Sequence, residues 1–414
     1  MITKETCRRI VLGQKKEMAR KVDVVHRAIL DDVMKHFRDN RVLILTGIRR
    51  SGKSTLLKQI MEKKPGCYVN FEDERLIDFQ AQDFEILNEV LIEIYGEVKN
   101  YFFDEIQNVP KFETFVRRLQ DENKKVLITG SNAQLLSKEF GTKLTGRYKT
   151  FEVYPFSFNE YLRYKKINFA KNDVYLTGKR VEILKAFKNY LLSGGFPEYL
   201  KNKDFDYLRT LYENILYKDI ITRYSVKREK TLKELVSILS TNISRPFTYN
   251  SIKKNLGLAN AITVKEYITY LNNSYLFFEL NKFSYSVKVQ LASPRKIYMI
   301  DTGLSQIIGT IFSDEKGRKL ENAVFIELKR RGYDIFYYSD NAECDFLIKK
   351  GNKITEALQV CHNLTEENKD REIEGLAKAM ENFNLNEGTI LTYDQEFVID
   401  NITVKPVWKY LLDI

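Results

Sequence analysis

A short stretch with two glycines near the amino terminus constrains most tightly how this chain can fold. Residues 43–60, LILTGIRRSGKSTLLKQI, combine an apolar run, a turn, and a segment with apolar residues at helical spacing. The apolar run is typical of a buried parallel strand, and the glycines let the loop curl so that backbone N–H groups point inward. This strand–loop–helix pattern predicts an α/β domain built on a parallel sheet.

The turn itself fits the pattern G-x-x-x-x-G-K-[ST], whose backbone amides surround the phosphates of a nucleotide. Lys53 is expected to neutralise the outer phosphates, Ser54 to bind Mg²⁺ through its hydroxyl, and the following helix to add partial positive charge. The sequence therefore predicts ATP and Mg²⁺ as cofactors. The predicted nucleotide-binding residues are Gly47, Ile48, Arg49, Arg50, Ser51, Gly52, Lys53, Ser54 and Thr55. For Arg49 and Arg50, a position facing solvent is the alternative.

A second apolar run, in KNYFFDEIQNVP, ends in two carboxylates. Asp104, at the carboxyl end of a strand, can hold Mg²⁺ through water, and Glu105 can orient or deprotonate the attacking water. The alternative is a solvated acidic turn. After a phosphate-binding loop, the pattern favours a metal residue followed by a catalytic base.

A third strand, KKVLITG, leads into Ser131 and Asn132, where a polar side chain could sense the γ-phosphate. Farther along, Arg147 could stabilise charge in the transition state, from the same chain or from a neighbouring subunit, or could form a surface ion pair. Lys53, Glu105, Asn132 and Arg147 are therefore the predicted catalytic residues. A homo-oligomer is possible, because an arginine supplied by a second subunit would require one.

The order of these pieces resembles the AAA-type P-loop ATPases. The stretches GIRRSGKSTLL, FFDEIQNVPKFE, LITGSNAQLLS and LTGRYKTFEVYPFSFNEYL are similar to a prokaryotic ATPase family whose members carry a winged helix and a restriction-endonuclease-like C-terminal domain. In that family the arginine of the Gly-Arg pair is a candidate arginine finger, which favours this role for Arg147. The resemblance covers nearly the whole chain. It implies an ATPase domain at 1–158, a helical lid or linker at 159–230, a winged helix-turn-helix at 231–312, and a nuclease-like α/β domain at 313–414.

The middle of the chain alternates aromatic and basic residues at helical spacing, which predicts helices. Ser193, Gly194 and Gly195 interrupt this spacing like a hinge. Residues 231–300 then read as three helices and a hairpin, with Gly257 in the turn between the second and third helices. DNA contact is the leading interpretation and protein contact the alternative. The residues expected on a phosphate-binding face are Lys253, Lys254, Thr263, Lys265, Lys282, Lys288, Arg295 and Lys296.

In the last segment, the resemblance implies an acidic residue on a first helix, an Asp on a strand, and a Glu-x-Lys on the next strand. Glu321 and Asp345 supply the first two positions. Gln359 and Cys361 stand where the glutamate and lysine belong, so the expected site (Glu321, Asp345, Gln359) is degenerate. We therefore expect a nuclease-like fold with lost or much reduced cleavage.

Composition sets the remaining limits. The 414 residues predict two to four domains, and a net charge of +11 favours polyanionic partners, here DNA. The absence of a long apolar segment predicts a cytoplasmic protein without a membrane partner. The leading hypothesis is an ATP-hydrolysing, DNA-associated switch. The alternatives are an ATP-gated, Mg²⁺-dependent nuclease and a regulator that binds ATP without hydrolysing it.

Overall fold

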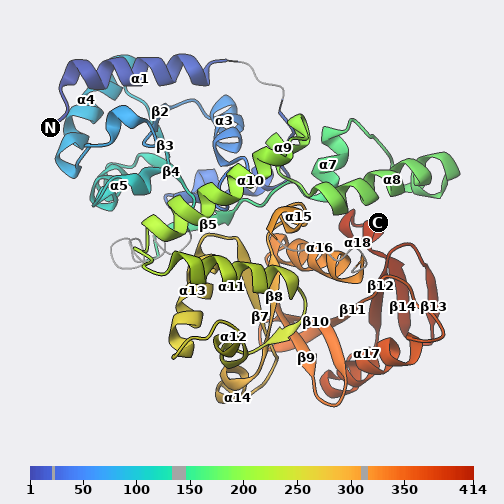
Figure 1. The fold of residues 1–414 in the computed structure, drawn as a ribbon. Helices are drawn as coiled ribbons and strands as arrows, with labels where there is room; N and C mark the ends of the chain where they lie inside the picture. Colours follow the sequence, from blue (N-terminus) through green and yellow to red (C-terminus); the bar gives the residue numbers. More distant parts are fainter. Residues whose placement is uncertain (21–23, 133–145, 309–315) are drawn as a thin grey trace. The chain divides into compact units, whose positions relative to one another are not determined.

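The chain forms two compact units, residues 1–154 and 155–414, in a computed structural model (Figure 1). The structure describes all residues except 21–23, 133–145 and 309–315. The division lies slightly before the predicted end of the ATPase domain at 158. The predicted lid, winged-helix and nuclease-like segments therefore belong to one unit.

The first unit is built on a five-stranded parallel sheet with the order β2-β3-β4-β1-β5. Its strands are β1 (Val42–Thr46), β2 (Cys67–Asn70), β3 (Asn100–Asp104), β4 (Lys125–Gly130) and β5 (Tyr148–Glu152). Its helices are α1 (Lys4–Met18), α2 (Ile29–Lys35), α3 (Lys53–Lys63), α4 (Phe84–Tyr95) and α5 (Phe112–Asp121). Short 3₁₀ turns lie at His36–Arg38, Glu74–Leu76, Ala81–Asp83 and Ile106–Asn108. The predicted parallel α/β sheet is confirmed.

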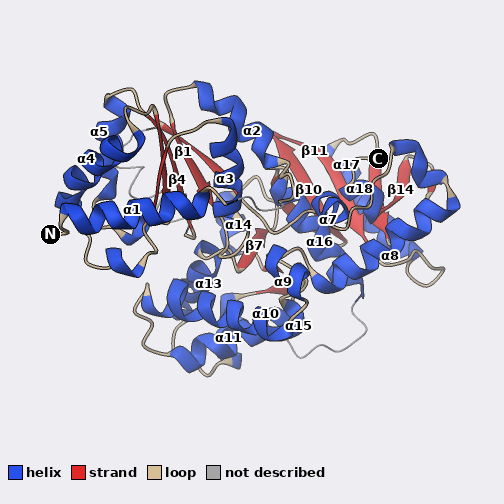
Figure 2. Cartoon of the chain, turned by 90° about the horizontal axis from the view of Figure 1, so that it is seen from above, coloured by secondary structure: helices blue, strands red, loops and turns tan. Residues whose placement is uncertain are grey.

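Side chains alternate between the two faces of this sheet, and each face has its own core. Along β1, Val42 and Ile44 pack with residues of α1, α4 and α5, whereas Leu43 and Leu45 pack with residues of α2 and α3. Figure 2 shows the helices on both sides of the strands. Because a strand buried on both faces reads as a continuous apolar run, the sequence could reveal β1 directly.

The second unit opens with helices and a small antiparallel sheet. The helices are α7 (Phe158–Tyr164), α8 (Thr177–Ser193), α9 (Pro197–Asn202), α10 (Phe205–Asn214), α11 (Glu229–Thr241), α12 (Tyr249–Asn255) and α13 (Ala261–Asn273). A 3₁₀ helix (Lys171–Tyr175) precedes α8, and a π-helix (Ile215–Thr222) continues α10. The sheet, in the order β6-β8-β7, contains β6 (Pro246–Phe247), β7 (Phe277–Asn281) and β8 (Arg295–Met299). The predicted hairpin strands are present, but helix α14 (Val287–Ala292) lies in their connection.

The end of the chain forms a six-stranded mixed sheet in the order β13-β14-β12-β11-β10-β9. Its strands are β9 (Asp334–Ser339), β10 (Glu343–Lys350), β11 (Lys353–Val360), β12 (Gly388–Thr392), β13 (Phe397–Ile399) and β14 (Ile402–Pro406). The helices are α15 (Ser305–Ile308), α16 (Lys316–Arg330), α17 (Lys369–Phe383) and α18 (Val407–Leu411). Within the described residues, every helix is too short or too polar to cross a membrane.

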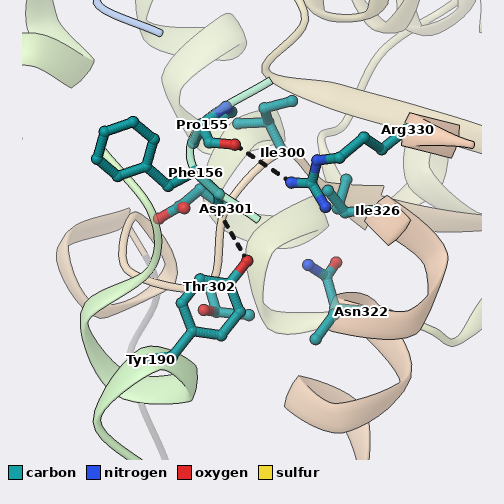
Figure 3. Close-up of a pocket in the computed structure, with 10 residues that line it drawn as sticks. Pro155, Phe156, Tyr190, Ile300, Asp301, Thr302, Asn322, Ile326 and Arg330 are labelled. Atoms are coloured by element: carbon teal, nitrogen blue, oxygen red, sulfur yellow. Dashed lines mark hydrogen bonds between the residues drawn. The ribbon is translucent and has the colours of Figure 1, made fainter. Parts of the chain in front are cut away.

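The glycine pair that the sequence suggested as a hinge is instead a point of close packing. A Cβ on Gly194, whose φ is +68°, would lie 1.8 Å from Asp301 Oδ1, and one on Gly195 would lie 2.3 Å from the Phe156 carbonyl oxygen. Asp301 accepts hydrogen bonds from the backbone N–H groups of Gly195 (2.6 Å) and Gly303 (2.8 Å), and burial raises its pKa to about 6. Figure 3 shows Asp301 and Phe156 lining one small pocket. The interpretation as a hinge is wrong, because a hinge must be free to move, whereas Gly194 packs against the Asp301 side chain and Gly195 against the Phe156 backbone.

This packing predicts that one added methyl group lowers the stability of the second unit strongly. Gly195→Ala should lower the free energy of unfolding of the second unit by about 2–4 kcal/mol, because the Phe156 backbone must move to admit the side chain. Gly178→Ala, in α8, is the matched control. A Cβ there meets nothing within 4 Å, so alanine should be neutral or stabilising by up to about 1 kcal/mol. Urea denaturation of both variants measures the difference, and equal stabilities would contradict the packing argument.

Candidate functional site

The predicted nucleotide-binding loop joins the end of β1, which lies between β4 and β5 in the first sheet, to the start of α3. Three of its residues, Gly47, Arg50 and Gly52, have positive φ angles of 147°, 65° and 97°. A Cβ on Gly47 would lie 2.2 Å from the Val153 carbonyl oxygen, so only glycine fits at the point where the loop leaves the strand. The loop therefore curls as the motif predicts, and glycine is required for a steric reason seen in the structure.

The side chain of Lys53 lies inside this loop and is 4% exposed. Its Nζ donates hydrogen bonds to the carbonyl oxygens of Gly47 (3.1 Å) and Ile48 (3.2 Å), and lies 3.7 Å from Glu105 Oε1. An ammonium group has three N–H donors, and here two of them are taken by carbonyl oxygens of the loop itself. A phosphate group at this position would meet a buried cation and the first turn of a helix.

Asp104, the last residue of β3, is the buried carboxylate of the site. It accepts hydrogen bonds from the Thr129 hydroxyl and from the Tyr68 hydroxyl, the latter at 3.1 Å. Burial raises the pKa of Asp104 and the neighbouring Glu105 charge adds to this, while hydrogen bonds from the Thr129 and Ser54 hydroxyls lower it. A divalent cation would compensate this buried charge.

These residues fit Mg²⁺, because a serine hydroxyl and a carboxylate are hard oxygen donors and the Ser54 hydroxyl lies near enough to lower the pKa of Asp104. Ser54 and Asp104 are the residues that would hold the metal. When bound, Mg²⁺ would neutralise charge that develops on the phosphate oxygens.

Glu105 follows Asp104 with an unusual backbone conformation. Its φ is +50°, in the left-handed region that a glutamate rarely adopts, and its N–H donates to the Thr129 hydroxyl at 3.0 Å. The side chain is 12% exposed and accepts a hydrogen bond from the Gln107 amide. A strained residue held by its neighbours often marks a functional position, and here Glu105 Oε1 lies 3.7 Å from Lys53 Nζ.

Ser131 and Asn132 follow β4 directly and are 1% and 0% exposed. Because β4 lies between β3 and β1, both residues lie at the same edge of the sheet as the loop and Asp104. The structure therefore brings them near the site, and their contact with a γ-phosphate stays a prediction. The rest of the stretch quoted for them, from residue 133, lies outside the described residues.

Arg147 does not lie at this edge. Its carbonyl oxygen accepts a hydrogen bond from the Val42 N–H (3.0 Å), so it lies beside the amino end of β1. The phosphate loop begins at the other end of that strand, roughly 13 Å away at about 3.3 Å per residue. The guanidinium also points to Asp121, at 3.2 Å, and is 59% exposed. A finger acting on the nucleotide of its own chain is therefore wrong, whereas a contribution to a neighbouring subunit stays a prediction.

The remaining residues of the loop fall into a buried and an exposed group. Ile48 and Ser51 are fully buried, whereas Arg50, Ser54 and Thr55 are exposed. Arg49 forms an ion pair with Glu72 at 2.6 Å, so a competing carboxylate already holds its guanidinium. This favours a structural role for Arg49.

Three side chains of the site have no motif that would have revealed them. Thr129 and Tyr68 donate their hydroxyls to Asp104, and each is a polar group within an otherwise apolar strand, which was the only available signal. Arg27 is 4% exposed and donates to the carbonyl oxygens of Ser51 (2.9 Å) and Tyr154 (2.6 Å). It ties the phosphate loop to the segment after β5. Nothing in its local sequence could have shown this.

The predicted DNA-binding residues separate into exposed and buried groups. Lys254, Lys265 and Lys288 are exposed, and Lys253 and Thr263 are partly exposed, so these five stay predictions. Arg295 is 9% exposed and lies between Glu279 (3.7 Å) and the Tyr249 ring, while Lys296 is 1% exposed. Placing Arg295 and Lys296 on a phosphate-binding face is wrong, because strand β8 turns both side chains inward. Lys282 is paired with Asp340 at 2.6 Å.

The residues predicted for a degenerate nuclease site do come together. The Asp345 N–H donates to Gln359 Oε1 at 3.1 Å, and Asp345 Oδ1 lies 2.8 Å from Lys296 Nζ. Glu321 Oε1 lies 3.4 Å from the same ammonium. The structure brings the two carboxylates and the amide together, and it adds a lysine from another strand that the sequence did not indicate.

Comparisons with known proteins support the predicted ATPase domain at the start of the chain and match the middle of the chain to a domain of unknown function. Residues 39–162 match the model of an AAA domain, and residues 184–314 match a domain of unknown function. A solved Walker-type ATPase of Pyrococcus abyssi is 17% identical, with a TM-score of 0.46 over 70% of this chain and 97% of that one.

Two curated relatives extend over the whole length. An uncharacterized protein of Methanocaldococcus jannaschii is 36% identical over 100% of this chain and 96% of its own length. An uncharacterized protein of Haemophilus influenzae is 31% identical over 91% of this chain and 96% of its own length. The chain therefore belongs to the same family as these two relatives, and its own residues 39–162 form an AAA domain.

Proposed function

We propose that this protein binds ATP with Mg²⁺ and hydrolyses it to ADP and phosphate in the first unit. The observation that carries the proposal is the convergence of Lys53, Ser54, Asp104 and Glu105 at one edge of the sheet. Lys53 would bind the outer phosphates, Ser54 and Asp104 would hold the metal, and Glu105 would activate water. Asn132 would report the presence of the γ-phosphate.

We further propose that nucleotide turnover switches the protein between DNA-associated states. Support comes from the order α11, β6, α12, α13, β7, β8, in which three helices and a three-stranded antiparallel sheet follow the plan of a winged helix. The third helix, α13, begins with the side chain of Asn260 as its cap and carries the exposed Lys265, while Lys254 is exposed on α12. Lysines on such a face would contribute salt-sensitive affinity for phosphates and little sequence preference.

The last part of the chain, in this proposal, is a nuclease-like module that does not cut. Its order, α16, β9, β10, β11, α17, β12, fits the first helix and following strands that the resemblance implied, with Glu321 on the helix, Asp345 on β10 and Gln359 on the next strand, β11. Gln359 on β11 hydrogen-bonds to Asp345 and is not a metal-binding carboxylate. Its role would be to bind DNA or a partner.

Phosphate release measured with and without double-stranded DNA, over a salt series, tests hydrolysis and DNA coupling together. We expect slow basal turnover that DNA changes at low salt, with the effect fading as salt rises. Lys254→Ala with Lys265→Ala should weaken DNA binding and lower the slope of log affinity against log salt by about two. A control double variant, Lys201→Ala with Lys353→Ala, removes two exposed lysines outside the proposed winged helix and should leave the slope unchanged. Hydrolysis without any DNA effect would leave the ATPase and reject the DNA switch.

A further inference from the structure

One lysine of the small sheet lies among three carboxylates of the C-terminal sheet and its helix. Lys296 Nζ is 2.6 Å from Glu343 Oε1, 2.8 Å from Asp345 Oδ1 and 3.4 Å from Glu321 Oε1. The lysine side chain is 1% exposed, and those of Asp345 and Glu321 are 7% and 11% exposed. Glu343, with a side chain 43% exposed, closes the cluster on the solvent side.

Asp345, Glu321 and Gln359 make further hydrogen bonds in the cluster. Asp345 Oδ2 accepts the Val360 N–H at 3.0 Å, and Glu321 Oε1 also accepts the Tyr298 hydroxyl at 2.7 Å. The amide oxygen of Gln359 accepts a hydrogen bond from the Asp345 N–H. Its amide N–H donates to Glu372 Oε2, at 2.6 Å. Converging carboxylates of this kind usually hold a divalent metal ion in a nuclease. Here an ammonium group lies at the point toward which they converge.

The charges are consistent with a permanent internal cation. Burial by itself would lower the pKa of Lys296, but the facing carboxylates of Asp345, Glu321 and Glu343 raise it well above its usual value. Burial raises the pKa of Glu321, and the charge of Asp345 adds to this. Within the part of the chain that the structure describes, no three His, Cys, Asp or Glu side chains are arranged to hold a metal ion.

On the basis of the nuclease-like module proposed above, we propose that the Lys296 ammonium takes the position of the divalent cation among these carboxylates and converts the cluster into a fixed joint between β8 and the C-terminal sheet. Neighbouring contacts support the joint. The Tyr298 ring stacks on Phe325 with centroids 4.0 Å apart, and Asn322 exchanges hydrogen bonds of 2.8 and 2.9 Å with the Met299 backbone. The small sheet and α16 are therefore joined by a charged contact, a stacked contact and a hydrogen-bonded contact. Removing the lysine would leave two buried carboxylates without their cation.

Manganese binding to the full chain, titrated without nucleotide, tests this proposal. The wild type should show no Mn²⁺ site that depends on Asp345 and should not cut plasmid DNA with Mn²⁺. Lys296→Met removes the charge but keeps an unbranched side chain. This variant should gain a Mn²⁺ site at least tenfold tighter than any site of the wild type, and Asp345→Asn in the same chain should remove it again. Lys282→Met, which neutralises a lysine paired with the more exposed Asp340, is the matched control and should gain nothing.

Two outcomes would overturn the proposal: Mn²⁺ binding or cutting by the wild type that Asp345→Asn abolishes, and a folded Lys296→Met variant without a new Mn²⁺ site. A thermal measurement covers the case in which Lys296→Met is too unstable for titration. Its melting temperature should fall by several degrees and recover in part with Mn²⁺, whereas Mn²⁺ should not stabilise the wild type. Equal responses to Mn²⁺ in the two proteins would overturn the proposal as well. ATP hydrolysis is a separate readout, because none of these residues belongs to the nucleotide site.

Discussion

Lys53→Met should lower the affinity for ATP by about 100-fold or more, because the buried ammonium is the cation that faces the phosphates inside the loop. Two carbonyl oxygens, of Gly47 and Ile48, now accept its hydrogen bonds at 3.1 and 3.2 Å. Methionine preserves the length of the side chain and removes its charge and its donors. Titration with a fluorescent ATP analogue measures the loss. Phosphate release should fall with it to the background rate.

Lys58→Met is the matched control for this experiment. Lys58 lies on the same helix, α3, and its Nζ donates to the Arg20 carbonyl oxygen, away from the loop. It should bind ATP within about threefold of the wild type, since the charge it loses does not face the phosphate site. If Lys53→Met bound ATP as tightly as this control does, the loop would not be the nucleotide site. Thermal unfolding of both variants would show whether each is folded.

Glu105→Gln should keep ATP binding and lower phosphate release by about 100- to 1000-fold. Glutamine has nearly the same shape but cannot accept a proton from water, so the chemical step is lost and the binding site is kept. The backbone hydrogen bond from Glu105 to Thr129, at 3.0 Å, does not depend on the side chain and should hold the left-handed turn in place. The variant is expected to accumulate in the ATP-bound form.

The control for the glutamate is Glu122→Gln, an exposed position at the end of α5. Its turnover should equal that of the wild type. An unchanged rate of phosphate release in Glu105→Gln would favour a regulator that binds ATP without hydrolysing it, provided that the wild-type rate is itself no higher than background. A wild-type rate well above background with no effect of the substitution would assign the water-activating role to another residue.

Much of the first unit could be predicted because its signals are local. An apolar run, two glycines and a lysine within one short stretch specified β1, the loop and α3, and the carboxylates of Asp104 and Glu105 followed an equally clear strand. Parallel strands present their carboxyl ends at one edge of a sheet, so motifs at those ends had to meet. Arg147 escaped this reasoning because it precedes its strand, and an arginine before β5 lies at the opposite edge.

In the second unit, patterns within short stretches of sequence could not predict which charged side chains are buried. The sequence predicted that Arg295 and Lys296 are surface charges on a hairpin. Inside the fold, Glu279 compensates the charge of Arg295, and Glu321 and Asp345 compensate that of Lys296. These carboxylates come from other elements of the chain. Gly195 read as a hinge because its packing partner, Phe156, lies far away along the chain. Arg27 could not be recognised for the same reason, because the Ser51 and Tyr154 carbonyl oxygens that it contacts are distant in sequence.

The sequence by itself determined the strand–loop–helix motif and the pair of carboxylates that follows β3, because these depend on spacing within single strands and turns. Only the tertiary structure decided which charges are buried, which glycines are steric requirements, and which lysine lies among the carboxylates of Glu321, Glu343 and Asp345. The physical reason is that a buried charge is stable only beside its compensating partner, and that partner came from a strand or helix elsewhere in the chain.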